Sequence, residues 1–554
     1  MGAVSNYWHT LRHLRPIQLY GRVWFRLVRP RVDLRPPPML RAPSGRAWVQ
    51  AARREQSLLG PERFRLLNET QDLSNEGWDN PARDKLWRYN LHYFDDLNAR
   101  DATARTEWHR ALITRWLREI PPGRGTAWEP YPTSLRIVNW IKWDLAGNPL
   151  SPESAASVAV QARWLSKRLE THLLGNHLFA NAKALVFAAC FFEGSEAERW
   201  LDRGMRILER EVPEQILSDG SQFERSTMYH ALALEDLMDL WNVTASYVRA
   251  IPSRWESTIG DWRERIGSMR DWLAAMCHPD GEISYFNDAS IGIAPSPAEL
   301  ERYAQRLGFS DRPALGAPMT WLRESGYIRI ERDDAVAILD VAPIGPDYLL
   351  GHAHADTLSF ELSLFGQRVL VNTGTSCYGS SAERLRQRGT PAHNTVVVDG
   401  QNSSEVWAGF RVARRARPIG LEVRLEPAIE VRCAHDGFRR LPGKPEHTRH
   451  WLIGSSRLVI EDRVSGTVGR AEARFHLHPS IRIDANAGDD DQRKDVVVQL
   501  PQGQRVHFSV EGGVLRWEES VWSSEFGRTE ANLCLVADLE GPVLRTRIQW
   551  SSAV

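Results

Sequence analysis

Leu358-Ser-Phe-Glu-Leu-Ser-Leu364 alternates apolar and polar side chains with a period of two. This alternation predicts a β-strand with one buried face. Residues 108–117 and 178–189 instead repeat apolar side chains at helical spacing. The change of period falls near Gly326. Runs of helices followed by runs of short strands predict an all-α unit and an all-β unit in one chain.

The length of the chain also requires more than one unit. Its 554 residues exceed what a single hydrophobic core usually supports, and a hydrophobic fraction of 42% excludes wholesale disorder. We therefore expect an α+β multidomain protein. Residues 1–60 would form a basic N-terminal arm, residues 61–320 a helical domain, and residues 321–554 an antiparallel β-sandwich.

Charge is balanced over the chain but not along it. The sequence has 70 Lys and Arg against 70 Asp and Glu, so it lacks the overall basic field of proteins that coat nucleic acids. The first 55 residues nevertheless contain 11 Arg and only two acids, Asp33 and Glu55. Such an arm could steer a polyanion or touch a membrane surface, or it could lie as a solvated strap over the first domain.

No segment of the sequence is typical of a membrane span or a secretory signal. The apolar stretch at residues 17–28 is interrupted by Gln18, Arg22 and Arg26. The N-terminus lacks the apolar core of a signal peptide. The sequence therefore predicts a cytoplasmic protein without an integral membrane segment. A periplasmic or secreted location is the alternative, if a signal has been removed.

The first cluster with chemical potential is Gly175-Asn176-His177, at the start of an apolar helix. An amide and an imidazole beside the free N–H groups of a helix start can bind a carboxylate. The alternative is a helix-capping Asn with an incidental His.

The second cluster surrounds Tyr229. Glu224 and Arg225 precede this residue by about one helical turn. A nearby cation would lower the pKa of Tyr229 and favour the phenolate. The alternative is a structural ion pair beside a tyrosine at the edge of the core.

The third cluster combines His352 and His354 with two later β segments. In a strand these two histidines would share a face, and the later segments supply Asn372 and His393. Two His plus one oxygen ligand predict a metal site. Asn372 is a weaker ligand than a carboxylate, so a hydrogen-bonded cluster with the same bracing role stays open.

These clusters belong to a series of six motifs that occur in a fixed order. The chain thereby resembles the heparinase II/III family, which is related to the alginate lyases with an α/α toroid. The motifs are Asn90-Leu-His-Tyr-Phe-Asp95, Trp128-Glu-Pro-Tyr131, Gly175-Asn-His177, Phe223-Glu-Arg-Ser-Thr-Met-Tyr229, Gly351-His-Ala-His-Ala-Asp356 and Ala392-His-Asn-Thr-Val-Val-Val-Asp-Gly400.

The resemblance implies an incomplete (α/α) toroid followed by antiparallel β-sheets, with an active site in the cleft between them. It also implies a polysaccharide lyase that acts by β-elimination at a uronic acid. Asn176 and His177 match the positions that neutralise the uronate carboxylate. Tyr229 matches the catalytic tyrosine, which protonates the leaving O4 and is a candidate for taking the C5 proton. His352 matches a cleft histidine, a candidate base or carboxylate partner.

The resemblance further places a structural zinc, in some members, at the positions of His354, Asn372 and His393. The family commonly has Asp where this chain has Asn372, which makes occupancy by zinc an open question. No organic cofactor is implied, and the partner would be an anionic polysaccharide. Candidate substrate-binding residues are Trp128, Tyr131, Glu224, Arg225, Arg388 and Trp407, with core packing as the alternative for the aromatic side chains.

Two other functions compete with a lyase for an exopolysaccharide, a capsule or a glycosaminoglycan-like chain. One is a non-catalytic polysaccharide-binding or assembly protein of an exopolysaccharide pathway, which the absent signal peptide favours. The other is a glycoside hydrolase on the same scaffold. It would need two suitably spaced carboxylates, for which Glu224 and Asp356 are available.

Overall fold

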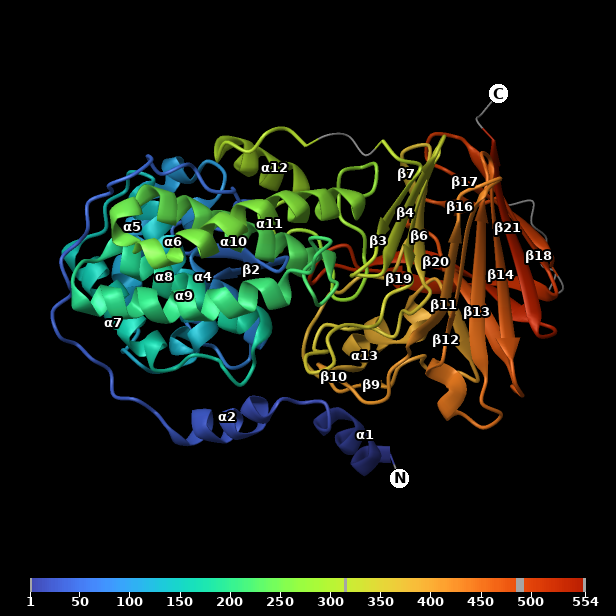
Figure 1. The fold of residues 1–554 in the computed structure, drawn as a ribbon, viewed down its shortest axis with the longest axis horizontal. Helices are drawn as coiled ribbons and strands as arrows, with labels where there is room; N and C mark the ends of the chain where they lie inside the picture. The colour runs from blue at the N-terminus through green and yellow to red at the C-terminus, as the bar shows by residue number, and fades with distance from the viewer. Residues whose placement is uncertain (1, 313–315, 485–492, 552–554) are drawn as a thin grey trace.

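The computed structural model describes residues 2–312, 316–484 and 493–551. Figure 1 shows a helical half and a strand half side by side. The last helix of the first half, α12, ends at Arg306, and the first strand of the second half, β3, begins at Met319. The change of period near Gly326 therefore marks the junction closely.

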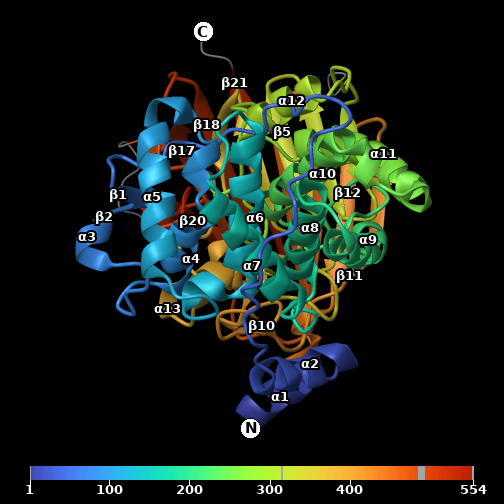
Figure 2. The same ribbon diagram turned by 90° about the vertical axis from the view of Figure 1, so that its left-hand side faces the viewer.

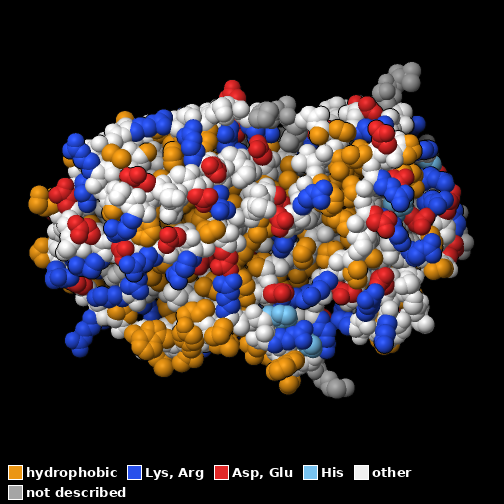
Figure 3. Space-filling model, in the orientation of Figure 1, with side chains coloured by type: hydrophobic (Ala, Val, Ile, Leu, Met, Phe, Trp, Pro, Cys, Tyr) orange, Lys and Arg blue, Asp and Glu red, His pale blue; other side chains and the backbone are white. Residues whose placement is uncertain are grey.

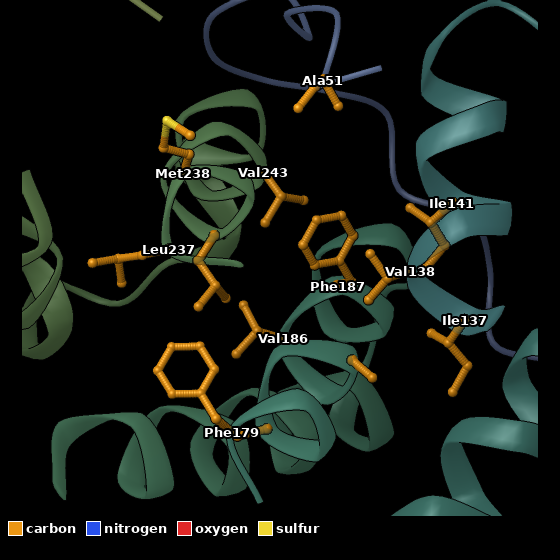
Figure 4. Packing of buried hydrophobic residues seen from close by; sticks show 14 of the residues in the cluster. Ala51, Ile137, Val138, Ile141, Phe179, Val186, Phe187, Leu237, Met238 and Val243 are labelled. Atoms are coloured by element: carbon orange, nitrogen blue, oxygen red, sulfur yellow. The ribbon is translucent and has the colours of Figure 1, made fainter. Parts of the chain in front are cut away.

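The helical half is an incomplete toroid of antiparallel helix pairs. Its longest member, α9, packs along α8, and α8 also contacts α6 and α10. Figure 4 shows side chains of α6, α8 and α10 meeting in one apolar core. The main helices are α4 (Lys85–Tyr93), α5 (Thr106–Glu119), α6 (Pro130–Leu145), α7 (Pro152–Ser166), α8 (Gly175–Phe191), α9 (Ser195–Gln215), α10 (Thr227–Ser246), α11 (Glu256–Ala275) and α12 (Pro297–Arg306).

The strand half is a sandwich of two layers. One layer is an eight-stranded antiparallel sheet with the order β11-β12-β13-β14-β21-β18-β17-β16. The other joins a five-stranded sheet, β3-β4-β5-β6-β7, to a four-stranded sheet, β19-β20-β15-β8, through a bridge between Leu370 and Leu477. Phe360, Phe475 and Trp451, from β6, β15 and β13, lie in one buried cluster between the layers.

The strands that frame the site belong to the second layer. The alternating segment predicted from Leu358 forms β6 (Phe360–Leu364), which pairs with β5 (Ala335–Asp340) and β7 (Gln367–Leu370). Strands β1 (Arg63–Leu66) and β2 (Glu69–Asp72) pair with each other before the toroid helices. The remaining strands, all in the second half, are β3 (Met319–Leu322), β4 (Tyr327–Arg332), β8 (Val396–Val398), β9 (Val406–Trp407), β10 (Arg411–Val412), β11 (Pro418–Arg424), β12 (Ile429–His435), β13 (Glu446–Ile453), β14 (Arg457–Ser465), β15 (Ala471–His476), β16 (Arg482–Ile483), β17 (Asp495–Gln499), β18 (Arg505–Glu511), β19 (Gly513–Trp522), β20 (Glu530–Leu539) and β21 (Val543–Ser551).

The two halves are held together by an apolar seam with polar contacts beside it. Trp272 and Met276, in and just after α11, share a buried cluster with Tyr327 and Ile338 of the five-stranded sheet. Next to this cluster, His278 lies 2.8 Å from a carboxylate oxygen of Glu361 on β6. A seam of this kind fixes the walls of the cleft between the halves.

The N-terminal arm is partly helical, which the sequence prediction of a simple strap did not include. Helices α1 (Gly2–Leu11) and α2 (Pro16–Leu27) lie on one side of the molecule (Figures 1 and 2) and contact its body through side chains such as Thr10 and Gln18. The chain then runs extended along the toroid, where the backbone N–H of Arg41 donates to the carbonyl of Phe191. None of the described helices is long and apolar enough to cross a bilayer.

Candidate active site

A cleft with two lobes lies between the toroid and the sandwich. The lobe beside the arm has a volume of about 640 Å³ and the lobe inside the toroid a volume of about 560 Å³. Both lobes are lined by the predicted residues Asn176, His177 and His352, together with Leu173 and Phe410. These three residues therefore lie at the junction of the lobes, where a chain-like ligand could span both, and Tyr229 lines the lobe inside the toroid.

Asn176 and His177 project from the first turn of α8. The turn is sharp because Leu174 and Gly175 both have positive φ, 64° and 55°. A Cβ on Gly175 would lie 2.5 Å from the Leu349 side chain, so glycine is required there. This turn directs the Asn176 amide and the free N–H groups of the helix start toward the cleft.

His177 is paired with a buried carboxylate. Its Nδ1 lies 3.1 Å from Oε1 of Glu170, and its ring lies against that of Tyr131. Burial opposes the charged imidazole, but the Glu170 carboxylate outweighs this effect and raises the pKa of His177 above 6.5. With Nδ1 bound to Glu170, Nε2–H is left to donate to an anion.

Tyr229 lies near the start of α10, whose first turn is capped by the Ser226 hydroxyl. Its hydroxyl is 2.9 Å from that of Tyr378, and its ring stacks on His352 with 4.0 Å between ring centroids. Burial, with Tyr378 and Asp288 nearby, raises the pKa of Tyr229 well above 10. The phenol is therefore a proton donor at neutral pH.

The sequence prediction of a cation-stabilised phenolate is wrong. Arg225 precedes α10 and turns away from Tyr229. Its guanidinium donates to the carbonyl of Ser325, 2.9 Å away, and no ion pair joins Arg225 to Glu224 among the described residues. Sequence spacing placed these residues on the helix of Tyr229, but α10 begins only at Thr227.

His352 is oriented by Asp288. Its Nδ1 lies 2.8 Å from Oδ2 of Asp288, and its Nε2 lies 3.9 Å from Glu224. Burial favours the neutral acid, but Arg384 and the two histidines hold the pKa of Asp288 well below its usual range. An ionised Asp288 accepts a hydrogen bond from Nδ1–H of His352. In the neutral ring, Nε2 then carries the lone pair on the cleft side.

The same carboxylate also binds His354 and Arg384. His354 Nε2 is 2.8 Å from Oδ1 of Asp288, and Arg384 binds both carboxylate oxygens. The segment containing His352 and His354 is a loop rather than the predicted strand. The two histidines converge because Asp288 binds one with each of its oxygens.

The predicted substrate-binding residues divide into two groups. Tyr131 and Glu224 line the cleft, and so does Trp407, which packs edge-on against Tyr7 of the arm and donates to Thr10. Burial raises the pKa of the Glu224 carboxyl. These three side chains therefore form part of the cleft wall.

The prediction of sugar contact is corrected for Trp128, Arg225 and Arg388, because each is buried and engaged inside the protein. Trp128 packs in the toroid core against Trp116. Arg388 is fully buried and donates to the carbonyls of Ala353 and Leu350. These side chains brace the walls of the cleft instead of lining it.

The three predicted metal ligands, His354, Asn372 and His393, lie together, but none of their side chains carries a negative charge. The rings of His354 and His393 lie 5.3 Å apart between centroids, and His354 Nδ1 and His393 Nε2 are buried without a hydrogen-bond partner among the described residues. Burial lowers the pKa of His354 to about 4 and that of His393 well below 6.5. Both nitrogens are therefore free to coordinate.

The third predicted ligand does not fit a closed zinc site. Asn372 Oδ1 already lies 3.2 Å from His393 Nδ1, and its Nδ2 is the group without a partner. The described residues contain no cluster of three or more His, Cys, Asp or Glu able to hold a metal. Two imidazoles and an amide lack the anionic ligands that divalent zinc prefers in structural sites.

We expect the wild-type protein to bind zinc weakly and Asn372→Asp to bind it at least about tenfold more tightly. The added carboxylate supplies the missing charge. Isothermal titration calorimetry with ZnCl₂ measures the change, and His393→Ala in the Asn372→Asp background should remove the gain. Zinc that stays bound to the wild type during dialysis against a chelator would contradict the expectation.

Three residues of the site escaped the sequence analysis: Glu170, Asp288 and Tyr378. Each lies in a loop and belongs to none of the motifs. Asp288 lies 64 residues before His352 along the chain, although the two side chains are in direct contact. The sequence shows only that these residues are polar, and many surface positions are polar too.

A toroid joined to a layered β-sandwich, with Tyr, His and Asn side chains gathered in the cleft between them, defines the toroid class of polysaccharide lyases. Residues 80–311 match the family model for the heparinase II/III N-terminus, and residues 314–551 match the model for the heparinase II/III-like C-terminal region. The chain therefore belongs to the heparinase II/III family and is a polysaccharide lyase, a carbon–oxygen lyase.

Several individual proteins are also similar to this chain. A heparin-sulfate lyase from Bacteroides stercoris is 26% identical over 549 residues, covering 86% of this chain and 77% of that protein. FtsZ-localized protein C from Caulobacter vibrioides is 23% identical over 464 residues, covering 77% and 75%. A crystal structure of heparinase III shares the fold with a TM-score of 0.69 at 18% identity, covering 86% of this chain and 80% of that chain.

Proposed function

We propose that the protein cleaves a uronate-containing polysaccharide by β-elimination at the junction of the two lobes. The observation that carries the proposal is the position of His352 Nε2 and the Tyr229 hydroxyl beside Asn176 and His177 in one cleft. A base, an acid and two carboxylate-binding groups are what this reaction requires.

The carboxylate must be neutralised first. The C5 proton of a uronate is only weakly acidic, because its removal adds negative charge next to an existing carboxylate. Asn176 and the imidazolium of His177 would donate hydrogen bonds to that carboxylate and stabilise the developing enolate. The raised pKa of His177 supports this role, since the Glu170 carboxylate favours the charged ring.

His352 and Tyr229 would then move the protons. Nε2 of His352 takes the C5 proton, and the electron pair of the C5–H bond forms the C4–C5 double bond. The C4–O4 bond breaks, and O4 receives the proton of the Tyr229 hydroxyl. Solvent returns a proton to Tyr229 and removes one from His352. The raised pKa of Tyr229 and the Asp288-bound tautomer of His352 favour this division of roles.

The charges of the toroid lobe suggest a substrate with few sulfate groups. Acids outnumber bases among the residues lining it, which include Asp84, Asp95, Glu129 and Glu170 against Arg54 and Lys85. A densely sulfated chain would be repelled there, whereas isolated uronates can be accommodated. A glycosaminoglycan-type or bacterial polyuronate of low sulfation fits this lobe best.

The test is a panel of polyuronates offered in matched sulfated and unsulfated forms. Unsulfated chondroitin with chondroitin sulfate, and heparosan with heparin, give two such pairs, and glucuronan and alginate complete the panel. Elimination is read as a rise in the ultraviolet absorbance of the unsaturated uronate. We expect the unsulfated member of a pair to be the better substrate. Binding without any rise in absorbance across the panel would favour a non-catalytic polysaccharide-binding protein.

The hydrolase alternative has less support from the site. Asp356, the second carboxylate considered with Glu224, is buried and accepts a hydrogen bond from the backbone N–H of Asn287. It does not line either lobe of the cleft. Asp356 therefore cannot act with Glu224 as the second catalytic carboxylate of a hydrolase.

Glu170→Gln should shift the alkaline limb of the pH–rate profile to lower pH. The Glu170 carboxylate raises the pKa of His177. Replacing it with a neutral amide favours the uncharged ring, so the carboxylate-binding imidazolium is lost at lower pH. Tyr229 titrates far higher and does not set this limb.

Profiles of kcat/KM against pH for the wild type and Glu170→Gln measure the shift. Glu129→Gln is the matched control, because Glu129 also lines the toroid lobe but binds Lys85 and Tyr89. The alkaline limb should stay in place in this control. A Glu170→Gln enzyme with an unshifted limb and a merely lower rate would assign Glu170 a structural role only.

A further inference from the structure

The N-terminal arm carries most of the exposed apolar side chains of the protein. Among the described residues, 13 of the 19 exposed large hydrophobic side chains fall between Val4 and Leu40. Trp24 is 67% exposed and Leu27 is 76% exposed. Figure 3 shows the resulting apolar patch over α2 and a smaller one over α1 on the same side of the molecule. Apolar surface of this extent usually marks an interaction site.

The outward face of α2 is continuous. Leu19, Val23 and Leu27 form one row at four-residue intervals, and Tyr20 and Trp24 form the adjacent row. Together they make one apolar face along the whole helix. On α1, exposed Val4, Tyr7, Trp8 and Leu11 likewise share one face.

The opposite face of α2 is already attached to the body. Gln18 and Gly21 are buried, and Gln18 donates to the carbonyl of Tyr348. Phe25 packs on His172 with 4.3 Å between ring centroids, and the guanidinium of Arg168 lies over Phe25. The helix is therefore held by contacts with both halves, and its apolar face remains turned to solvent.

A row of arginines borders this apolar face. Arg22, Arg26 and Arg29 recur along one edge of α2 and beyond its end, all exposed, and within the described part of the chain no ion pair joins them to an acid. The sequence has no Asp or Glu before Asp33. The patch is thus both apolar and basic, and these three arginines have no paired acid among the described residues.

We propose that α1 and α2 dock the protein on an anionic lipid surface. The aromatic and aliphatic face would enter the boundary between headgroups and acyl chains, where Trp and Tyr are favoured. The arginines would lie at the level of the lipid phosphates and bind them. Trp24, Arg26, Leu27 and Arg29 lie outside the cleft lining, whereas Tyr7, Leu11 and Arg22 also line the lobe of the cleft beside the arm.

Charge argues against a second copy of the chain as the occupant. In a two-fold symmetric dimer the same patch faces itself. The arginine rows of both copies would then lie close together with no acid from either arm to compensate. An anionic bilayer supplies both the apolar volume and the opposite charge that this face requires.

Co-sedimentation of the full chain with vesicles tests the proposal. We expect binding to vesicles of phosphatidylcholine with phosphatidylglycerol, and at least about tenfold weaker binding to phosphatidylcholine alone. Trp24→Ser/Leu27→Ser should weaken binding to the anionic vesicles at least about tenfold, and Arg26→Gln/Arg29→Gln should weaken it and reduce its salt dependence.

Val248→Ser/Leu425→Ser is the matched control, because both side chains are exposed and apolar but lie outside the arm. It should bind like the wild type. Failure of the wild type to bind anionic vesicles overturns the proposal, as does equal binding by Trp24→Ser/Leu27→Ser. A dimer in light scattering that this variant abolishes, without vesicle binding, would assign the face to a second copy. None of these substitutions lies in the cleft lining, so polyuronate cleavage tests the proposed function separately.

Discussion

Tyr229→Phe should lower kcat for polyuronate cleavage by about 10²–10⁴-fold while leaving the fold intact. The change removes only the hydroxyl that is proposed to protonate the leaving O4. Among the described residues that hydroxyl has one hydrogen-bond partner, the Tyr378 hydroxyl at 2.9 Å. Loss of the hydrogen bond lowers the free energy of unfolding by about 1 kcal/mol, so substrate binding and the unfolding temperature should change little.

Steady-state rates from ultraviolet absorbance and a thermal unfolding curve measure the two effects together. Tyr247→Phe is the control, because Tyr247 is also buried but packs in the toroid core outside the cleft lining. It should keep full activity. A Tyr229→Phe enzyme with wild-type kcat would remove Tyr229 from the proton-transfer step.

Asn176→Ala and His177→Ala should each lower kcat by about 10²–10³-fold on a carboxylate substrate. Each variant loses a donor that is proposed to stabilise the enolate that forms as C5 loses its proton. The effect depends on the charge of the substrate, which provides a selective test. In a methyl-esterified polyuronate the carboxylate charge is already removed, so the penalty should fall to about tenfold or less.

Rates on matched free-acid and methyl-ester substrates measure this difference. The Tyr229→Phe penalty should stay the same on both substrates, because protonation of O4 does not depend on the ester. Equal losses of Asn176→Ala on the acid and the ester would show that Asn176 supports the fold of the cleft instead of the carboxylate.

The architecture was largely readable from the sequence. The change from helical to alternating periodicity separates α12 from β3, and the segment predicted from Leu358 is a central strand of its sheet. Periodicity reports which face of an element is buried, and burial dominates the choice of fold.

The site was only partly readable. Asn176, His177, Tyr229 and His352 lie in recognisable motifs and meet in the cleft. Asp288 gave no local signal, because its role depends on contacts with residues distant in the chain.

Arg225 and Arg388 were predicted as candidates to bind the anionic sugar. Both are buried, and tertiary structure supplies the carbonyls that satisfy them. For the arm, the sequence predicted only its basic charge. Which side chains of α2 face solvent became clear from the structure, because Gln18 and Gly21 are buried against the body.

The most direct test of β-elimination is to cleave a polyuronate that serves as a substrate in water labelled with heavy oxygen. The products are then analysed by mass spectrometry. Elimination forms the C4–C5 double bond without adding water. We therefore expect the new non-reducing ends to be unsaturated. In products reduced with borohydride at once, which stops exchange of the anomeric oxygen with water, we expect no heavy oxygen from the solvent. Saturated ends, with one heavy oxygen incorporated per cleavage, would contradict this expectation and identify the protein as a hydrolase.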